Sequence, residues 1–278
     1  MKMELTINST KTLHNGVEMP RFGLGVYKMT DKEKAVEAMM AALGSGYRAI
    51  DTATVYDNER EVGEAVRASG TKRESLFITS KVWNTDQGYD QTLRAFEASL
   101  ERLGFDYLDL YLTHWAVPGK YEDTYRAIQR LYDEKLVRSI GVSNHHQHHL
   151  EKIMAKANIK PMVNQIELHP QLTQEPLRQF CADNDIAVTS WSPLARARLL
   201  DDPVLAEIGQ AHGKSIAQII IRWHLQSDLI VIPKSVTPSR IAENADVFDF
   251  SLAEEEMKKI DGLNQDWRSG TDPDKIEA

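Results

Sequence analysis

Three apolar stretches of the sequence end in side chains that can exchange protons. Asp51 closes the stretch YRAID, and Tyr56 follows it in the next segment. Lys81 lies near the end of LFITSKV, and His114 lies near the end of YLDLYLTHW. A lysine that ends an apolar segment needs a carboxylate, because an unpaired ammonium is costly to bury. Asp51 is the candidate partner.

Together, these four residue types suit the protonation of an oxygen atom. A tyrosine is a usable acid when its pKa, ordinarily about 10, is brought nearer to neutrality. We expect Lys81, held charged by Asp51, to favour the tyrosinate and so to make Tyr56 a better acid. His114 can hydrogen-bond the same oxygen, which fixes its position and polarises it. Any one of the four could be structural, but four on neighbouring segments are hard to explain in that way.

Eight short apolar runs alternate with longer helical patterns along the chain. The runs cover residues 22–26, 47–51, 76–82, 107–115, 137–144, 162–168, 186–192 and 229–235. One of the helices between them is expected to stop at Gly104, a usual residue after a helix end. Eight strand–helix repeats predict an α/β fold, a closed (β/α)8 TIM barrel.

Further elements are expected outside the eight repeats. The N-terminal stretch predicts a β-hairpin with Asn15-Gly16 as its turn. Two extra helices are predicted, at residues 203–212 and 253–263. We treat residues 1–278 as a single domain.

The rival architecture is a doubly wound open sheet. It would carry a glycine-rich phosphate turn after the first strand, and GLGVYK offers Gly23 and Gly25 but no third glycine. In a barrel, by contrast, active sites lie at the carboxyl ends of the strands. That edge is where Asp51, Lys81 and His114 fall.

Composition narrows the class of partner. Lys plus Arg number 33 and Asp plus Glu number 41, for a net charge of −8. Such a chain is a poor candidate for binding nucleic acid or an anionic membrane. The lone Cys181 cannot form an intramolecular disulfide, which fits a reducing cytosol. We expect a cytoplasmic monomer with no membrane span and a small-molecule substrate.

Eight motifs resemble those of the aldo-keto reductase family. They are GVEMPRFGLGVYK, GYRAIDTATVYDNEREVG, ITSKVWN, LDLYLTHW, IGVSN, NQIELHP, SWSPL and IPKSVTPSRIAEN. The resemblance implies a catalytic tetrad of Asp51, Tyr56, Lys81 and His114. It implies an NADP-dependent oxidoreductase acting on CH–OH groups, which reduces small aldehydes, dicarbonyls or keto-sugars such as methylglyoxal or 2,5-diketo-D-gluconate. The hydride must come from a nicotinamide, because no side chain can donate one.

The same resemblance implies that NADPH is the cofactor. A dianionic 2′-phosphate calls for Arg, Lys and a hydroxyl, and positive charge at a helix N-terminus otherwise opposes the helix dipole. The implied cofactor residues are Ser143, Asn144 and Gln165 for the carboxamide, Trp191 for the nicotinamide ring, Ser192 and Leu194 beside them, and Lys234, Ser235, Arg240, Glu243 and Asn244 for the 2′-phosphate and adenine.

Substrate contacts are implied for three aromatic residues and His114. The aromatic residues are Tyr27, Trp83 and Trp115. Ala116 replaces a proline that is usual in the family, which we expect to reshape the pocket but not the tetrad. The C-terminal tail DWRSGTDPDKIEA is short and polar, so we expect an open, tolerant pocket.

The stretch SNHHQHHLEKI raises the question of a metal site, because four histidines lie within five residues. His145 and His149 are spaced to share a helix face. A zinc site would need a third ligand and groups that orient it, and none is evident in the sequence. We therefore expect no metal, with His114 as the functional histidine.

Two other functions use the same residues. The first is a binding module that holds NADPH without turnover, which a broken tetrad or long extensions would favour; neither is present. The second is a barrel hydrolase with Asp51 and Glu167 as paired carboxylates. Asp51 is better explained as the partner of Lys81.

Overall fold

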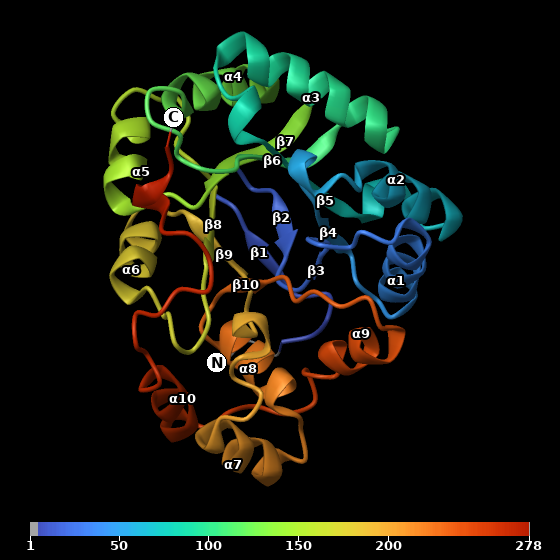
Figure 1. Cartoon of the computed structure of the whole chain (residues 1–278), viewed down its shortest axis with the longest axis vertical. Helices are drawn as coiled ribbons and strands as arrows, with labels where there is room; N and C mark the ends of the chain where they lie inside the picture. Colours follow the sequence, from blue (N-terminus) through green and yellow to red (C-terminus); the bar gives the residue numbers. More distant parts are fainter. Residues whose placement is uncertain (1–4, 278) are drawn as a thin grey trace.

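Eight parallel strands form the wall of a barrel, with helices packed around its outside (Figure 1). The computed structural model describes residues 5–277. The strands are β3 (Leu24–Gly25), β4 (Ala49–Asp51), β5 (Phe77–Val82), β6 (Leu108–Thr113), β7 (Val137–Ser143), β8 (Val163–Glu167), β9 (Ala187–Trp191) and β10 (Ile230–Val231). Nearly all their residues are buried on both faces, which is why they read as continuous apolar runs.

The barrel closes between its first and last strands. Each strand pairs with the next in chain order from β3 to β10. A parallel bridge then joins Phe22 to Val231. The amide of Val231 donates to the carbonyl of Arg21 at 2.9 Å, and the amide of Gly23 donates to the carbonyl of Val231 at 3.1 Å. The predicted TIM barrel is confirmed, and the open sheet is excluded.

A helix follows every strand of the barrel. These helices are α1 (Lys32–Gly44), α2 (Glu59–Ala68), α3 (Tyr89–Leu103), α4 (Tyr121–Asp133), α5 (Gln147–Met154), α6 (Glu175–Asp183), α8 (Ile216–Gln226) and α9 (Pro238–Ala245). As predicted, α3 ends at Gly104, whose φ of 68° is easy only for glycine.

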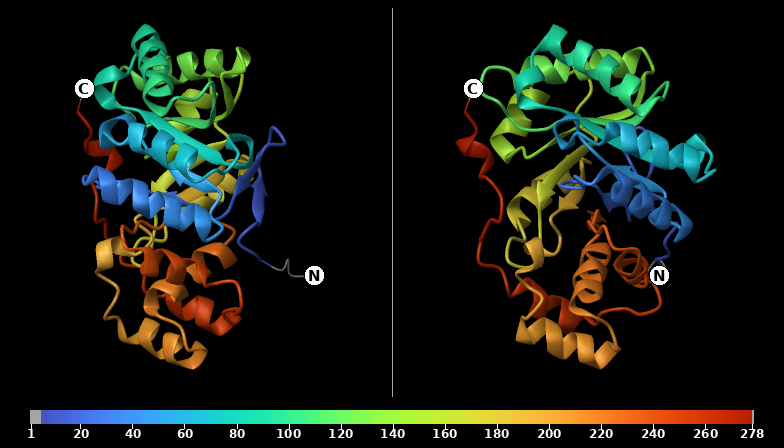
Figure 2. Two further views of the ribbon diagram at one scale, coloured as in Figure 1. Left: turned by 90° about the vertical axis from the view of Figure 1, so that its right-hand side faces the viewer. Right: turned by 45° about the vertical axis from the view of Figure 1, so that its right-hand side comes forward.

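The elements expected outside the repeats are also present. The hairpin pairs β1 (Thr10–Thr12) with β2 (Glu18–Pro20), and Gly16 in its turn has a φ of 85°. The extra helices are α7 (Pro203–His212) and α10 (Glu254–Asp261). Figure 2 shows the hairpin on the opposite side of the barrel from the C-terminal tail.

Cys181, the single cysteine of the chain, lies on α6 and is buried. Within residues 5–277, the helices lack the combination of length and apolar character that crossing a bilayer requires.

The contact between α2 and α3 depends on a glycine. A Cβ added at Gly63 would lie 1.9 Å from the carbonyl oxygen of Leu103, whereas one added at Gly44 meets nothing within 4 Å. We predict that Gly63→Ala lowers the free energy of unfolding by about 1–3 kcal/mol, the usual cost of overpacking. Gly44→Ala is the matched control and should change it by less than about 1 kcal/mol. Denaturant titration of both variants measures this, and equal stability would contradict the tight contact.

Candidate active site

A buried ion pair lies at the carboxyl end of two adjacent strands. β4 ends at Asp51, and β5 carries Lys81, whose side chain is fully buried. The Lys81 Nζ donates to Asp51 Oδ1 at 2.6 Å and to the carbonyl oxygen of Thr52 at 2.8 Å. The ammonium thus has the carboxylate partner that the sequence required.

Tyr56 reaches the same ammonium from the short helix η1 (Thr54–Tyr56) that follows β4. Its hydroxyl accepts a hydrogen bond from Lys81 Nζ at 3.4 Å. Burial, and then the negative charge of Asp51, raise the pKa of Tyr56 well above 10.0. The expectation that Lys81 brings this pKa toward neutrality is therefore wrong for the pocket as it stands, because desolvation outweighs the attraction to one ammonium.

His114 stands directly after β6, beside Tyr56. The two rings meet edge-on with centroids 5.7 Å apart, and Trp83 flanks His114 at 5.1 Å. Burial, and then the charge of Lys81, lower the pKa of His114 well below 6.5. The imidazole is therefore neutral at pH 7. Its Nδ1 is buried and has no hydrogen-bond partner within residues 5–277.

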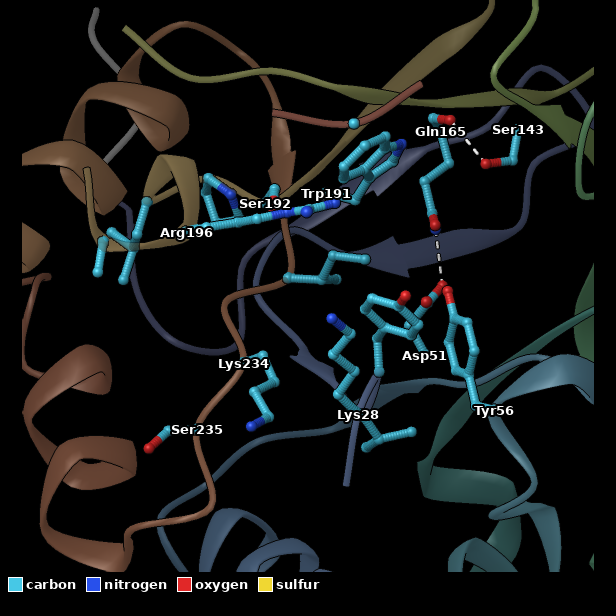
Figure 3. A pocket seen from close by; sticks show the side chains of 18 of the residues that line it. Lys28, Asp51, Tyr56, Ser143, Gln165, Trp191, Ser192, Arg196, Lys234 and Ser235 are labelled. Carbon is cyan, nitrogen blue, oxygen red and sulfur yellow. Dashed lines mark hydrogen bonds between the residues drawn. The ribbon is translucent and has the colours of Figure 1, made fainter. Parts of the chain in front are cut away.

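A network of hydrogen bonds ties the far wall of the barrel to the ion pair (Figure 3). Gln165 on β8 donates from Nε2 to Asp51 Oδ2 at 2.7 Å, and Ser143 donates to the carbonyl of Gln165 at 2.8 Å. Asn144 accepts from Trp191 Nε1 at 2.8 Å and donates to the carbonyl of His114 at 3.0 Å. The Asn144 amide thus bonds protein groups through both its oxygen and its nitrogen, and its oxygen holds Trp191.

One cavity is lined by nearly all of the predicted site residues. Its volume is about 1160 Å³, above the usual range for small-ligand pockets. Every residue predicted for catalysis, cofactor or substrate lines it except Lys81, which lies behind Asp51 and Tyr56. In Figure 3, Tyr56, Asp51 and Gln165 lie toward one side of the cavity, and Lys234 and Ser235 lie toward another.

The wall of the cavity is cationic although the chain is acidic overall. Its lining includes Lys28, Arg196, Lys234 and Arg240, against the two carboxylates of Asp51 and Glu243. Ser235 lies just before α9, and its hydroxyl accepts from the amide of Thr237 at 3.1 Å. Cations, a hydroxyl and the start of a helix are groups that bind phosphate.

Lys28 and Arg196 were not predicted as site residues. Both sit in left-handed backbone conformations, with φ of 58° and 53°. The segment around Arg196 has three such residues in succession, Ala195 to Ala197. The sequence LARAR contains no glycine that would predict this turn. The positive charge of Arg196 is the one sequence feature that could have suggested a role in the pocket.

Aromatic side chains border the end of the cavity near the tetrad. Tyr27 is 49% exposed, and its ring lies 5.0 Å from that of Tyr56 between centroids. The ring of Trp115 lies nearly parallel to His114 at 6.4 Å. The carbonyl of Trp115 accepts from Gln87 Nε2 at 2.7 Å, which fixes the loop at buried Ala116 without the family proline.

The C-terminal tail forms part of the cavity wall. Glu167, at the end of β8, accepts hydrogen bonds from the amide of Ser269 at 2.6 Å and the amide of Gly270 at 3.0 Å. Gly270, Thr271 and Ile276 line the cavity. The tail therefore encloses more of the pocket than its length led us to expect. The same contacts occupy both oxygens of Glu167, which argues against a hydrolase that pairs it with Asp51.

Comparison with known proteins agrees with this geometry. A model of the aldo/keto reductase family matches residues 21–265. Glyoxal reductase of Bacillus subtilis is 55% identical over 274 residues, which cover 99% of each chain. Methylglyoxal reductase DkgA of Salmonella typhimurium is 48% identical over 95% of this chain and 96% of its own.

Solved structures agree as well. A variant of Gox0644 crystallised in complex with NADPH is 44% identical and superposes with a TM-score of 0.92 over 96% of this chain and 98% of its own. An aldo-keto reductase from a deep-sea metagenome library gives a TM-score of 0.95 at 46% identity over 97% of this chain and 100% of its own. The family model and the near full-length relatives agree: the chain belongs to the aldo/keto reductase family of oxidoreductases.

Proposed function

We propose that residues 1–278 act as one NADPH-dependent carbonyl reductase domain in which Tyr56 donates the proton. The observation that carries the proposal is the contact of Tyr56 and His114 beside the buried Lys81–Asp51 pair, in a cavity lined by more cationic than anionic side chains. A carbonyl group placed there meets an acid, a neutral imidazole and a fixed positive charge within one small volume.

The proton passes from the Tyr56 hydroxyl to the substrate oxygen. The raised pKa keeps the Tyr56 hydroxyl protonated at neutral pH, so its proton is available for transfer. The transfer is favourable because the developing alkoxide is a stronger base than a phenolate. As the phenolate forms, the ammonium of Lys81 at 3.4 Å stabilises the new charge. Lys81 therefore acts chiefly on the charged product of the transfer.

His114 positions the carbonyl oxygen. Being neutral, it can donate one hydrogen bond from a ring nitrogen without placing a second full charge beside Lys81. Trp83 and Trp115 fix the plane of its ring. His114 holds the carbonyl oxygen in place beside the Tyr56 hydroxyl. The two groups are therefore correctly oriented for proton transfer, and such orientation accelerates the reaction.

The cavity suits NADPH. The cofactor, when bound, supplies the hydride that no side chain can donate. Trp191 offers a flat ring held by Asn144, and Ser143 and Gln165 lie on the strands beside it. At the cationic end, Lys234, Ser235 and Arg240 suit the ribose 2′-phosphate. Ser192, Leu194, Glu243 and Asn244 complete the proposed cofactor wall. The NADPH complex of Gox0644 supports this assignment.

The proposed substrates are small aldehydes, dicarbonyls and keto-sugars such as methylglyoxal or 2,5-diketo-D-gluconate. The names of the relatives, glyoxal reductase and methylglyoxal reductase, support this class. Tyr27, Trp83 and Trp115 can cover a small ligand and leave its polar groups in water. An adjacent carbonyl also withdraws electrons, so the reacting carbon accepts hydride more readily.

The first prediction concerns the acid. Tyr56→Phe keeps the ring and removes the proton, so kcat should fall by about 10²–10⁴-fold, the usual contribution of general acid catalysis. Binding of NADPH, measured by fluorescence titration, should be retained. Tyr107→Phe, outside the cavity, is the control. Near-normal turnover of Tyr56→Phe would show that another group is the acid.

The second prediction concerns cofactor choice. Arg240→Ala should weaken NADPH binding by about 1.5–3 kcal/mol, the range for a hydrogen bond to a charged group, and should affect NADH much less. Arg60 is exposed and does not line the cavity, so Arg60→Ala serves as the control. The measurement is the dissociation constant of each cofactor. Equal losses of affinity for NADPH and NADH would show that Arg240 does not bind the 2′-phosphate.

The third prediction concerns substrate size. We expect kcat/KM with NADPH to be higher for methylglyoxal and a diketogluconate than for a ketosteroid. The measurement is a panel of these compounds with an aromatic aldehyde as reference. A tenfold advantage for the ketosteroid, about 1.4 kcal/mol in transition-state binding, would contradict the small-substrate proposal and leave the reductase chemistry standing.

A further inference from the structure

The histidine cluster lies against the C-terminal tail. His146 caps the start of α5, and His148 and His149 stand in its first turn. Figure 2 shows the tail running along the side of the barrel to reach α5. There the short helix η5 (Pro273–Lys275) brings Asp272 and Asp274 to the histidines. The sequence did not reveal these carboxylates as possible ligands, because they lie more than a hundred residues away.

The imidazole and carboxylate groups are close enough to share an ion. His146 Nε2 lies 3.3 Å from Asp272 Oδ1, and His148 Nε2 lies 3.2 Å from Asp274 Oδ1. The ligand atoms of His146, Asp272 and Asp274 all lie within 4.8 Å of one another. Two ligands bound tetrahedrally at about 2.0–2.1 Å are themselves about 3.3 Å apart. The His146–Asp272 and His148–Asp274 pairs already have this spacing, and rotation of the exposed His148 and Asp274 side chains would bring the two pairs onto one ion.

We propose that His146, His148, Asp272 and Asp274 bind one divalent transition-metal ion of the zinc class, which fastens the C-terminal tail to the start of α5. Two imidazoles and two carboxylates form a ligand set that zinc accepts. The His148 and Asp274 side chains are 52% and 53% exposed. They are therefore free to rotate onto the ion, and the site is open to solvent for metal entry.

Two further contacts hold the ligands in place. Asp272 Oδ1 accepts from the amide of Asp274 at 3.1 Å, and this turn brings both carboxylates toward α5. His149 Nδ1 accepts from the amide of His146 at 3.2 Å, so the proton of its neutral ring is on Nε2. That protonated nitrogen lies 3.6 Å from Asp274 Oδ1, so it has no free lone pair to offer an ion. His149 is therefore a positioning residue and not a ligand.

The proposed ion would stabilise one wall of the cavity. The tail is held at Ser269 and Gly270 by Glu167, and the metal would hold it again at Asp272 and Asp274. Between and beside these two attachments lie Thr271 and Ile276, which line the cavity. The ion thus has a structural role at the pocket edge, outside the tetrad. The proposal does not depend on the reductase reaction.

The test is calorimetric titration of zinc chloride into the full, untagged, cofactor-free protein. We expect one ion per chain. The double variant His148→Ala, Asp274→Asn should weaken zinc binding by about tenfold or more. Loss of a group that only hydrogen-bonds to a metal ligand already lowers metal affinity by that factor. His212 pairs with Glu256 elsewhere on the surface, so His212→Ala is the matched control and should bind zinc normally.

Hydrogen exchange supplies a second readout. Zinc should slow exchange of the backbone amides of residues 271, 272 and 274–276 in the natural protein and not in the double variant. Aldehyde turnover should survive chelation, because the ion lies outside the tetrad. The proposal is overturned if zinc does not bind, if the double variant binds as well as the natural protein, or if exchange in the tail is unchanged. Loss of turnover on chelation, restored by zinc, would overturn the structural role. Absent turnover with normal zinc binding would count against the reductase alone.

Discussion

The buried ammonium of Lys81 is the constraint on which the rest of the site depends. Leaving such a charge without its carboxylate would be strongly destabilising, so β4 and β5 must align to keep Asp51 at 2.6 Å. The second oxygen of Asp51 is in turn held from across the barrel by Gln165. One charge therefore fixes the relative positions of three strands. It also fixes the place where Tyr56 can approach a positive group.

The two ends of the cavity differ in their electrostatic charge. At one end a single ion pair, a neutral imidazole and a protonated phenol keep the local net charge low. Toward the other end, Lys234 and Arg240 face a cavity within a chain whose net charge is −8. A concave cationic wall concentrates the field that an anionic cofactor meets. The overall charge of the protein therefore says little about what this pocket attracts.

Much of the fold could be predicted from sequence because each strand and helix carries its own local pattern. The eight apolar runs, the stop at Gly104 and the need of Lys81 for a carboxylate are of this kind. The hydrogen bond from Gln165 to Asp51 could not be predicted in this way. It depends on both side chains pointing into the barrel from strands that are far apart in the sequence. The pKa of Tyr56 depends on the balance of burial against charge, which residue types do not give. The approach of Asp272 to His146 depends on the path of the tail.

The burial of Cys181 has a consequence for the durability of the protein. Burial raises the pKa of its thiol to about 12, and the thiolate is the form that attacks electrophiles. The chain contains no other cysteine. Aldehydes and dicarbonyls are electrophiles that form adducts with accessible sulfur. With aldehydes and dicarbonyls as the proposed substrates, the absence of a reactive sulfur would protect the enzyme from this route of self-inactivation.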